Sequence, residues 1–207
     1  MAFTFFFRDQ AVLDQIRILA APTFSGRRHI DVWDAGCAHG PEAYSLATVL
    51  RESMGPFLFR NVRITASDVD ANFASQVTAG VYPYEQIQRV PDDLRTRYFH
   101  PLPEAPGLWR LREDLRRAVN FVHHDLLSLR PVREGFCLIV CKNVLLHFSE
   151  AERTAVIAMF HRALADGGFL VTEQTQTMPE SLAPGFVAVA PNARIWRKIT
   201  AAAAVPA

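Results

Sequence analysis

The chain has 207 residues, a length typical of one or at most two domains, and half of them are hydrophobic, which is enough for a sizeable core. Its 22 Lys and Arg residues nearly balance 21 Asp and Glu residues, so it lacks the basic excess that is typical of nucleic-acid-binding proteins. The three cysteines show no regular spacing and predict neither a disulfide framework nor a zinc site. The short apolar start FTFFF lacks the features of a signal peptide, and no apolar run is long enough to cross a bilayer, so we expect a cytoplasmic protein without membrane insertion.

The hydrophobic pattern predicts strands that alternate with helices along the chain. In the first part we expect a helix over residues 9–21, a strand over 30–35, a helix over 42–52, a strand over 62–66 and a helix over 71–79. In the last part we expect strands over 119–122 and 136–141, a helix over 149–164, a strand over 169–172 and two short strands near 186–189 and 195–199. Asp9 is expected to cap the first helix, Gly80 to end the third, and Ser149 with Glu152 to form a capping box.

Residues 80–118 interrupt this alternation. They are rich in proline and glycine, and the alternating run over 108–112 predicts a small β insert. Strands that alternate with helices favour a parallel sheet with helices on both faces, and the two short terminal strands suit an antiparallel edge. The sequence therefore predicts one α/β domain over residues 1–207, which begins with a segment and helix over 1–22 and carries a mostly parallel seven-stranded sheet.

Glycine and polar residues follow the predicted strands. Gly36 and Gly40 open a turn in which the backbone can approach a ligand, although the missing third glycine argues against a dinucleotide site. Asp68 ends the second strand and could accept hydrogen bonds from a ribose diol; the alternative is a helix cap, for which Asp70 competes. Asn143 follows the fourth strand, where a simple turn residue is the alternative. Together these positions predict a nucleoside-containing ligand at the carboxyl ends of the strands.

Four stretches, taken together, resemble the CheR family of chemotaxis-receptor glutamate methyltransferases. They are TFFFR at residues 4–8, VW followed by GPEAYS over 32–45, ASDVD followed by AGVY over 66–82, and FCLIVCKNVLLHF over 136–148. They cover most of the chain in the order of the family motifs. The resemblance implies a Rossmann-like class I methyltransferase fold, with S-adenosylmethionine as cofactor and S-adenosylhomocysteine as product. It also implies a protein substrate, such as a glutamate side chain of a chemoreceptor.

The resemblance also implies the residues of the site. Those expected to bind the cofactor are Thr4, Arg8, Gly36, Glu42, Asp68, Asp125, Leu126, Lys142 and Asn143. Among them Asp68 would hold the ribose, and Asp125 with Leu126 would flank the adenine, with Asp125 in place of the family's Asn. Arg8 would also position the acceptor carboxylate, and His147 would donate a hydrogen bond to the acceptor or act as a base. The alternatives are a surface ion pair of Arg8 with Asp9 or Asp14, and a core or rim role for His147.

Several departures from the family concern the substrate side. The family's helical domain ahead of the first motif is missing, Ala2 replaces Asn, and His147 replaces Tyr. Cys137 replaces the Asp of the fourth strand, and residues 174–176 replace the family's H-S-E stretch. Two alternatives therefore stay open: a methyltransferase that acts on another protein or on a small molecule, and a catalytically inactive module that binds S-adenosylmethionine and regulates a partner. The sequence does not predict the oligomeric state.

An arginine-rich stretch over residues 89–117 falls where the family carries a small β-subdomain. In relatives that subdomain docks a partner protein. The interleaved acidic residues predict instead an ordinary solvated face, and we favour this interpretation.

Overall fold

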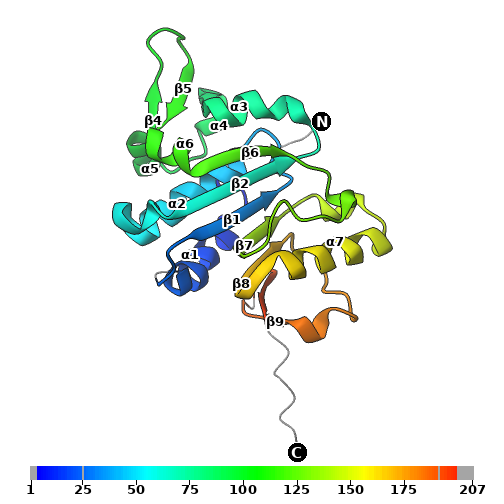
Figure 1. The fold of residues 1–207 in the computed structure, drawn as a ribbon. Helices are drawn as coiled ribbons and strands as arrows, with labels where there is room; N and C mark the ends of the chain where they lie inside the picture. The colour runs from blue at the N-terminus through cyan, green and yellow to red at the C-terminus, as the bar shows by residue number, and fades with distance from the viewer. Residues whose placement is uncertain (1–3, 25, 191, 200–207) are drawn as a thin grey trace, which may run out of the picture.

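The computed structural model describes residues 4–24, 26–190 and 192–199, and a seven-stranded sheet forms its centre (Figure 1). The strand order is β6-β2-β1-β7-β8-β10-β9. The strands are β1 (Ile30–Ala35), β2 (Val62–Asp68), β6 (Val119–His123), β7 (Phe136–Cys141), β8 (Leu164–Thr172), β9 (Phe186–Ala188) and β10 (Ile195–Lys198). The first five run parallel, and β10 pairs antiparallel with β8 and β9, which confirms the predicted antiparallel edge.

The chain enters the sheet at β1, an inner strand, and then adds strands on both sides of it. From β1 it passes to β2 and β6 on one side, and then returns to β7 and β8 on the other. The order of strands therefore reverses between β1 and β7, and in open α/β sheets ligands bind outside the carboxyl ends of the strands at such a point.

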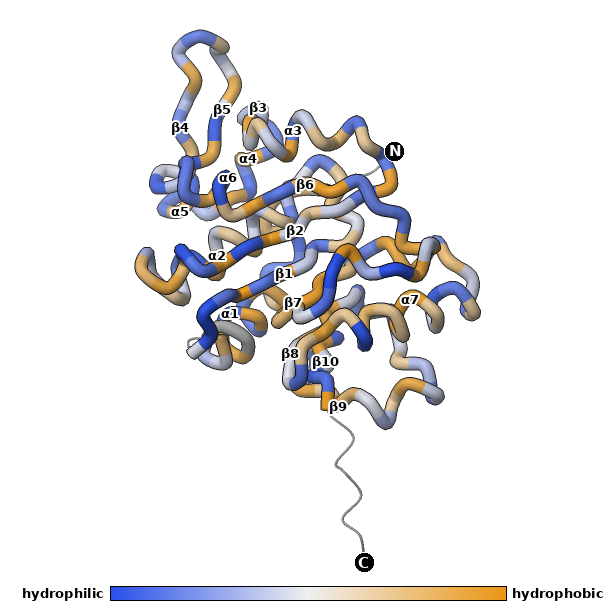
Figure 2. The backbone as a smooth tube through the Cα atoms, viewed as in Figure 1, coloured by the Kyte–Doolittle hydropathy of each residue, from blue (hydrophilic) through white to orange (hydrophobic). Residues whose placement is uncertain are grey.

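Helices cover both faces of the sheet. The helices α1 (Gln10–Phe24) and α2 (Pro41–Phe59) share one hydrophobic core with Val32 of β1, whereas α7 (Glu150–Ala163) shares a second core with Trp33. Because neighbouring side chains of a strand point to opposite faces, these two cores lie on opposite sides of the sheet. Figure 2 shows hydrophobic residues along strands such as β7 and hydrophilic ones along the connection that leads into it.

Residues 81–118 form the predicted β insert. The short strands β3 (Val81–Pro83), β4 (Phe99–Pro101) and β5 (Leu108–Leu111) pair antiparallel in the order β3-β5-β4, and the β4–β5 hairpin projects from the sheet (Figure 1). The insert also holds the helices α4 (Tyr84–Ile87), α5 (Asp92–Tyr98) and α6 (Glu113–Ala118). Four of its arginines form salt bridges with acids of the insert, namely Arg95 with Asp92, Arg110 with Glu104, Arg112 with Asp114 and Arg117 with Glu113. Such pairs of arginines with interleaved acids agree with the predicted solvated face.

Some predicted boundaries were wrong. The strand expected to begin at 169 begins at Leu164 and runs through the glycines, with an irregularity in its pairing to β7. A side chain at Gly168 would lie 2.9 Å from the Phe136 carbonyl oxygen, so glycine lets the two strands stay close there. Helix α2 continues to residue 59 because the chain turns helical again after a break at Gly55, whose φ is 71°.

The region after β2 also differs from the prediction. The helix expected over 71–79 is divided into a 3-10 turn, η1 (Ala71–Phe73), and the helix α3 (Ala74–Ala79). Asp9 does not cap α1 with its side chain: its φ is +57°, and its carboxylate reaches Lys142 instead. Gly80 ends α3 in the left-handed conformation, as expected.

The capping box of α7 gives a stability prediction. The Ser149 hydroxyl accepts a hydrogen bond from the Glu152 amide at 3.4 Å, and the Glu152 carboxylate accepts one from the Ser149 amide at 2.8 Å. We expect Ser149→Ala to lower the free energy of unfolding by about 1 kcal/mol, because the Glu152 amide loses its acceptor and the box loses one of its two bonds. Urea unfolding measures the change, and Ser149→Thr serves as the control that retains the hydroxyl. An alanine variant as stable as the threonine variant would contradict the prediction.

Candidate functional site

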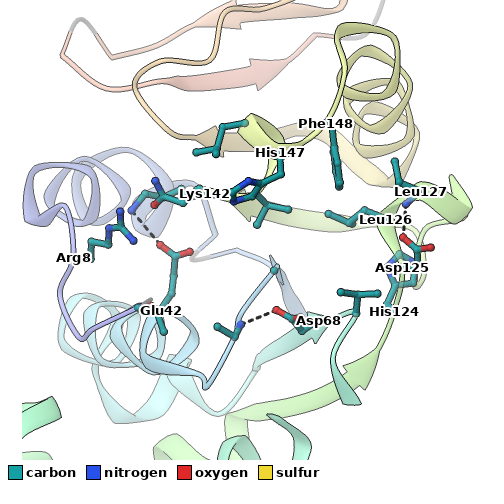
Figure 3. A pocket seen from close by; sticks show the side chains of 17 residues that line it. Arg8, Glu42, Asp68, His124, Asp125, Leu126, Leu127, Lys142, His147 and Phe148 are labelled. Carbon is teal, nitrogen blue, oxygen red and sulfur yellow. Dashed lines mark hydrogen bonds and ion pairs between the residues drawn. The ribbon is translucent and has the colours of Figure 1, made fainter. Parts of the chain in front are cut away.

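A pocket of about 760 Å³ opens at the carboxyl ends of β1, β2, β6 and β7, the edge at which the strand order reverses. All residues predicted to bind a cofactor or to act in catalysis line it, namely Thr4, Arg8, Gly36, Glu42, Asp68, Asp125, Leu126, Lys142, Asn143 and His147. They come from separate parts of the chain. Figure 3 shows the charged residues Arg8, Glu42 and Lys142 at one side, and Asp125 with its leucine neighbours at the other.

The loop after β1 depends on glycine. Gly36 has a φ of +92°, and the amides of Gly36 and Cys37 donate hydrogen bonds to the Ser67 carbonyl at 2.8 and 2.9 Å. A side chain on Gly36 would collide with the Val144 side chain, from the loop after β7. The absence of a side chain therefore lets the two loops that border the pocket approach each other closely.

Asp68 is held at the floor of the pocket by backbone amides. Its carboxylate accepts hydrogen bonds from the Ala38 amide at 2.9 Å and the Asp70 amide at 3.1 Å (Figure 3). Asp70 takes the capping role, because its own carboxylate accepts from the Asn72 amide at 3.0 Å. The alternative in which Asp68 caps the following helix is therefore wrong, and the Asp68 carboxylate is oriented at the pocket wall.

Asp68 carries a prediction for ligand binding. On the role that the resemblance implies for it, Asp68→Asn should weaken S-adenosylhomocysteine binding about tenfold or more, because a charged acceptor for the ribose diol would be replaced by a neutral amide. Calorimetric titration measures the affinity. Asp70→Asn is the matched control, since it changes a neighbouring carboxylate that only caps η1, and it should leave the affinity unchanged. Equal affinities of the Asp68 variant and the wild type would show that this carboxylate does not contact the ligand.

A charge cluster around the buried Lys142 lies at one end of the pocket. The Lys142 side chain is only 2% exposed, and its Nζ atom lies 2.8 Å from Asp9 Oδ2 and 3.1 Å from Glu42 Oε1. Burial by itself lowers the pKa of Lys142, but the attraction of Glu42 and Asp9 outweighs it and raises the pKa above its ordinary value. Lys142 is therefore a permanent cation between two carboxylates.

Arg8 lies beside this cluster and lines the pocket (Figure 3). The carboxylates that the alternative interpretation assigned to it have other partners: Asp9 pairs with Lys142, and Asp14 lies 3.8 Å from Arg17. The Arg8 guanidinium also lies over the Phe5 ring, 5.8 Å from its centre. The structure thus places a cation of Arg8 at the pocket wall.

The opposite end of the pocket is more apolar. Leu126 is buried, and Leu127 remains 41% exposed at the pocket rim. The Asp125 carboxylate accepts a hydrogen bond from the Leu127 amide at 2.8 Å, which orients the short turn η2 (Leu126–Ser128). A flat heterocycle with an amino group fits such a surface, because apolar side chains would pack on its faces and a carboxylate could accept from its edge.

The segment after β7 forms the remaining wall. Asn143 has a φ of +60°, which is uncommon for a residue with a side chain, and its amide donates to the Glu173 carboxylate at 3.3 Å. His147 ends the turn η3 (Leu145–His147), is exposed, and lies at the pocket (Figure 3). The alternative of a core residue is therefore wrong for His147, whereas a rim position agrees with the structure.

The departures from the family motifs fall mostly away from the pocket. Cys137 is buried within β7, and residues 174–176 follow β8; among the described residues, neither belongs to the pocket lining. Ala2 lies outside the described residues. Among the described residues, two of these departures therefore line the pocket, namely Asp125 and His147.

Sequence reasoning missed Asp34, a fully buried carboxyl group on β1. Burial first, and the neighbouring Glu42 carboxylate second, raise the pKa of Asp34 well above its ordinary value. The one signal in the sequence was an acidic residue inside the otherwise apolar strand end 32–35, since buried acids need a partner. The sequence could not identify that partner.

Comparisons of the sequence with known proteins agree on one family. Residues 2–188 match the family model described as CheR methyltransferase, SAM binding domain. The chain is 27% identical over 183 residues to a chemotaxis protein methyltransferase of Borreliella burgdorferi, with 84% of this chain and 64% of the relative covered. It is 32% identical over 157 residues to chemotaxis protein methyltransferase 2 of Pseudomonas aeruginosa, with 74% and 55% covered. The chain therefore spans less than two thirds of these relatives.

Solved structures agree on the fold. The magnesium protoporphyrin IX methyltransferase of Synechocystis PCC 6803, solved with bound SAM, superposes with a TM-score of 0.51 at 15% identity over 93% of this chain and 80% of that one. The predicted Rossmann-like class I methyltransferase fold is thereby confirmed. Among the described helices, none is long and apolar enough to span a membrane.

Proposed function

Because this chain belongs to the CheR methyltransferase family, we propose that it binds S-adenosylmethionine in the pocket described above and catalyses methyl transfer to a carboxylate of a protein. The observation that carries the proposal is the convergence of all ten predicted site residues on one pocket at the switch point of the sheet. The finer assignments belong to the same proposal: a chemoreceptor-like glutamate as acceptor, a cytoplasmic location, and one domain over residues 1–207.

The residues present fit the cofactor. The pocket volume lies in the range of about 300–1,000 Å³ that is usual for small-molecule sites. Glu42 and Arg8 offer a carboxylate and a cation at the same end, which suits the ammonium and carboxylate groups of an amino acid. Asp68 lies where a ribose diol could donate to it, and Asp125 with Leu126 offers an acceptor edge and an apolar face for a purine.

The reaction asks mainly for orientation. S-adenosylmethionine supplies, when bound, a methyl group on a sulfonium that is already activated for displacement. A glutamate acceptor is a carboxylate at neutral pH and needs no general base. The chain therefore has to hold the acceptor oxygen in line with the methyl carbon, and Arg8 is the cation suited to this task. His147, which lies beside Lys142 at the pocket (Figure 3), would donate a hydrogen bond to the acceptor.

Two experiments test the proposal. Calorimetry with S-adenosylmethionine and S-adenosylhomocysteine should show binding of both. Incubation with a radiolabelled methyl donor and a bacterial lysate should then label protein with a methyl group that alkali releases, as a carboxyl ester requires. Arg8→Ala should lower the labelling strongly. Absence of affinity for both nucleosides would overturn the proposal, whereas an alkali-stable label or a labelled small molecule would redirect it to another acceptor.

A catalytically inactive module remains the second candidate function, favoured by His147 in the place of the family's Tyr. It predicts nucleoside binding with no transfer to any acceptor. The binding and labelling experiments separate it from the first candidate.

A further inference from the structure

The carboxyl group of Asp34 is buried near the carboxyl end of β1 and accepts no hydrogen bond from the residues that the structure describes. Its strand is flanked on both sides, with Asp34 opposite Ala66 of β2 and Val140 of β7. The side chain is 0% exposed, and no nitrogen or hydroxyl of the described residues donates to either oxygen. An ionised carboxylate in this position would be strongly disfavoured, because it would have neither water nor a donor.

The polar neighbour of Asp34 is another carboxyl group, that of Glu42 at the start of α2, within hydrogen-bonding reach. Two carboxyl groups can form a hydrogen bond only if one of them holds a proton. Lys142 lies 3.1 Å from Glu42, whereas no described nitrogen donates to either oxygen of Asp34, so the proton is placed on Asp34. Asp34 is therefore the donor of this hydrogen bond, and Glu42 is the acceptor.

The remaining charged and titratable groups that face Asp34 agree with this assignment. Burial, Glu42 and Asp68 all disfavour a negative charge on Asp34. Lys142 favours such a charge, but its effect is smaller than that of burial or of Glu42. Cys37 and Cys141 lie close enough to sense Asp34, and burial raises the pKa of both thiols, so they remain neutral. Asp34 is thus a neutral acid beneath a charged pair.

We propose that Asp34 is a positioning residue that, in its protonated form, donates a hydrogen bond to Glu42 and thereby fixes the Glu42 carboxylate between Lys142 and the pocket. Glu42 lines the pocket, whereas Asp34 does not, so Asp34 acts through Glu42 and never touches the ligand. This inference rests on the proposed function, in which Glu42 accepts from the ammonium group of the cofactor's amino-acid end. It predicts that Asp34 matters for that end of the ligand and not for the nucleoside end.

The test compares two ligands and two substitutions. Asp34→Val removes the donor with a residue suited to a buried strand, and Asp34→Asn restores a donor in nearly the same shape. For S-adenosylhomocysteine we expect Asp34→Val to weaken binding about tenfold, and Asp34→Asn to restore most of the affinity. For methylthioadenosine, which lacks the amino-acid end, both variants should bind like the wild type. Asp34→Ala gives the same comparison if the valine variant does not fold.

A double-mutant cycle checks that the effect passes through Glu42. Adding Asp34→Val to Glu42→Gln should cost no further affinity, because the residue through which Asp34 acts has already been changed. Full additivity of the two losses would overturn the inference, as would equal losses for both ligands or a valine variant with normal affinity. Failure of the wild-type chain to bind either ligand would overturn the proposed function and this inference with it, so the two failures are distinguishable.

The proton itself can be detected through stability. A raised pKa in the folded state means that the folded chain binds more protons than the unfolded chain above the ordinary value of 3.8. The stability of the wild type relative to Asp34→Asn should therefore fall as the pH is raised above the ordinary value of 3.8, and should keep falling until the raised pKa of the folded state is passed. A difference that is constant above about pH 5 would place an ordinary ionised carboxylate at Asp34 and overturn the inference.

Discussion

Gly36→Ala should reduce the affinity for S-adenosylhomocysteine about 100-fold. Residues other than glycine rarely adopt the φ of +92° found here, and the added methyl group would also collide with Val144. The loops after β1 and β7 would have to separate, which displaces Lys142 and Asn143 at the pocket wall. Displacements of about 1 Å in an active site can lower the reaction rate about 100-fold, and we expect a loss of the same order in ligand affinity. Calorimetric titration measures the loss.

Two further variants separate backbone strain from collision. Gly135 has a similar φ of +87°, but a side chain there would meet no atom within 4 Å. Gly135→Ala should therefore cost about 1 kcal/mol of stability and leave the affinity unchanged. In the Gly36→Ala background, Val144→Ala removes the colliding group and should recover part of the affinity. No recovery would mean that the collision does not cause the loss.

Lys142→Met should lower the free energy of unfolding by about 2–3 kcal/mol, less than the full cost of breaking a buried ion pair, because the Glu42 side chain is 15% exposed but that of Asp9 is 47% exposed. The Lys142 side chain is 2% exposed, and its loss would leave the carboxylates of Asp9 and Glu42 without their shared cation. Chemical denaturation measures the change, with circular dichroism as the signal. A loss below about 1 kcal/mol would contradict the charge cluster around the buried Lys142, since that is the usual range of exposed pairs.

The other lysine of the chain is the matched control. The Lys198 side chain is 14% exposed, donates to the Leu164 carbonyl at 2.8 Å and lies 3.6 Å from Asp166, whose side chain is 67% exposed. Because no buried carboxylate loses its cation there, Lys198→Met should cost less than Lys142→Met. The pH dependence has a definite sign. Because the pKa of Lys142 is raised in the folded state, its contribution is complete below the ordinary value of 10.5 and disappears only as the pH rises through the folded value. The difference between wild type and Lys142→Met should not change on this account between about pH 6 and pH 9.

The sequence by itself determined the framework of the site. The strands over 30–35 and 136–141 were predicted with the bounds that the structure shows. For 136–141 the reason is a continuous apolar run, which marks a strand buried on both faces. Parallel strands bring their carboxyl ends to one edge, so the order of strands and helices along the chain is enough to assign Gly36, Asp68 and Asn143 to a common crevice. Local chemistry also sufficed for the capping box of Ser149, which involves residues only three positions apart.

Tertiary structure alone decided which charges meet. Lys142 and Glu42 are 100 positions apart, and Asp9 reaches the same ammonium group from a third part of the chain. Hydrophobic periodicity reports which face of an element is buried, but it does not report which polar side chains find one another inside the fold. For the same reason the sequence did not predict the state of Asp34, because it does not show whether an acidic residue in a strand is exposed to solvent or paired inside the fold. Its neutral state follows from complete burial beside Glu42, which only the packing of α2 on β1 brings about.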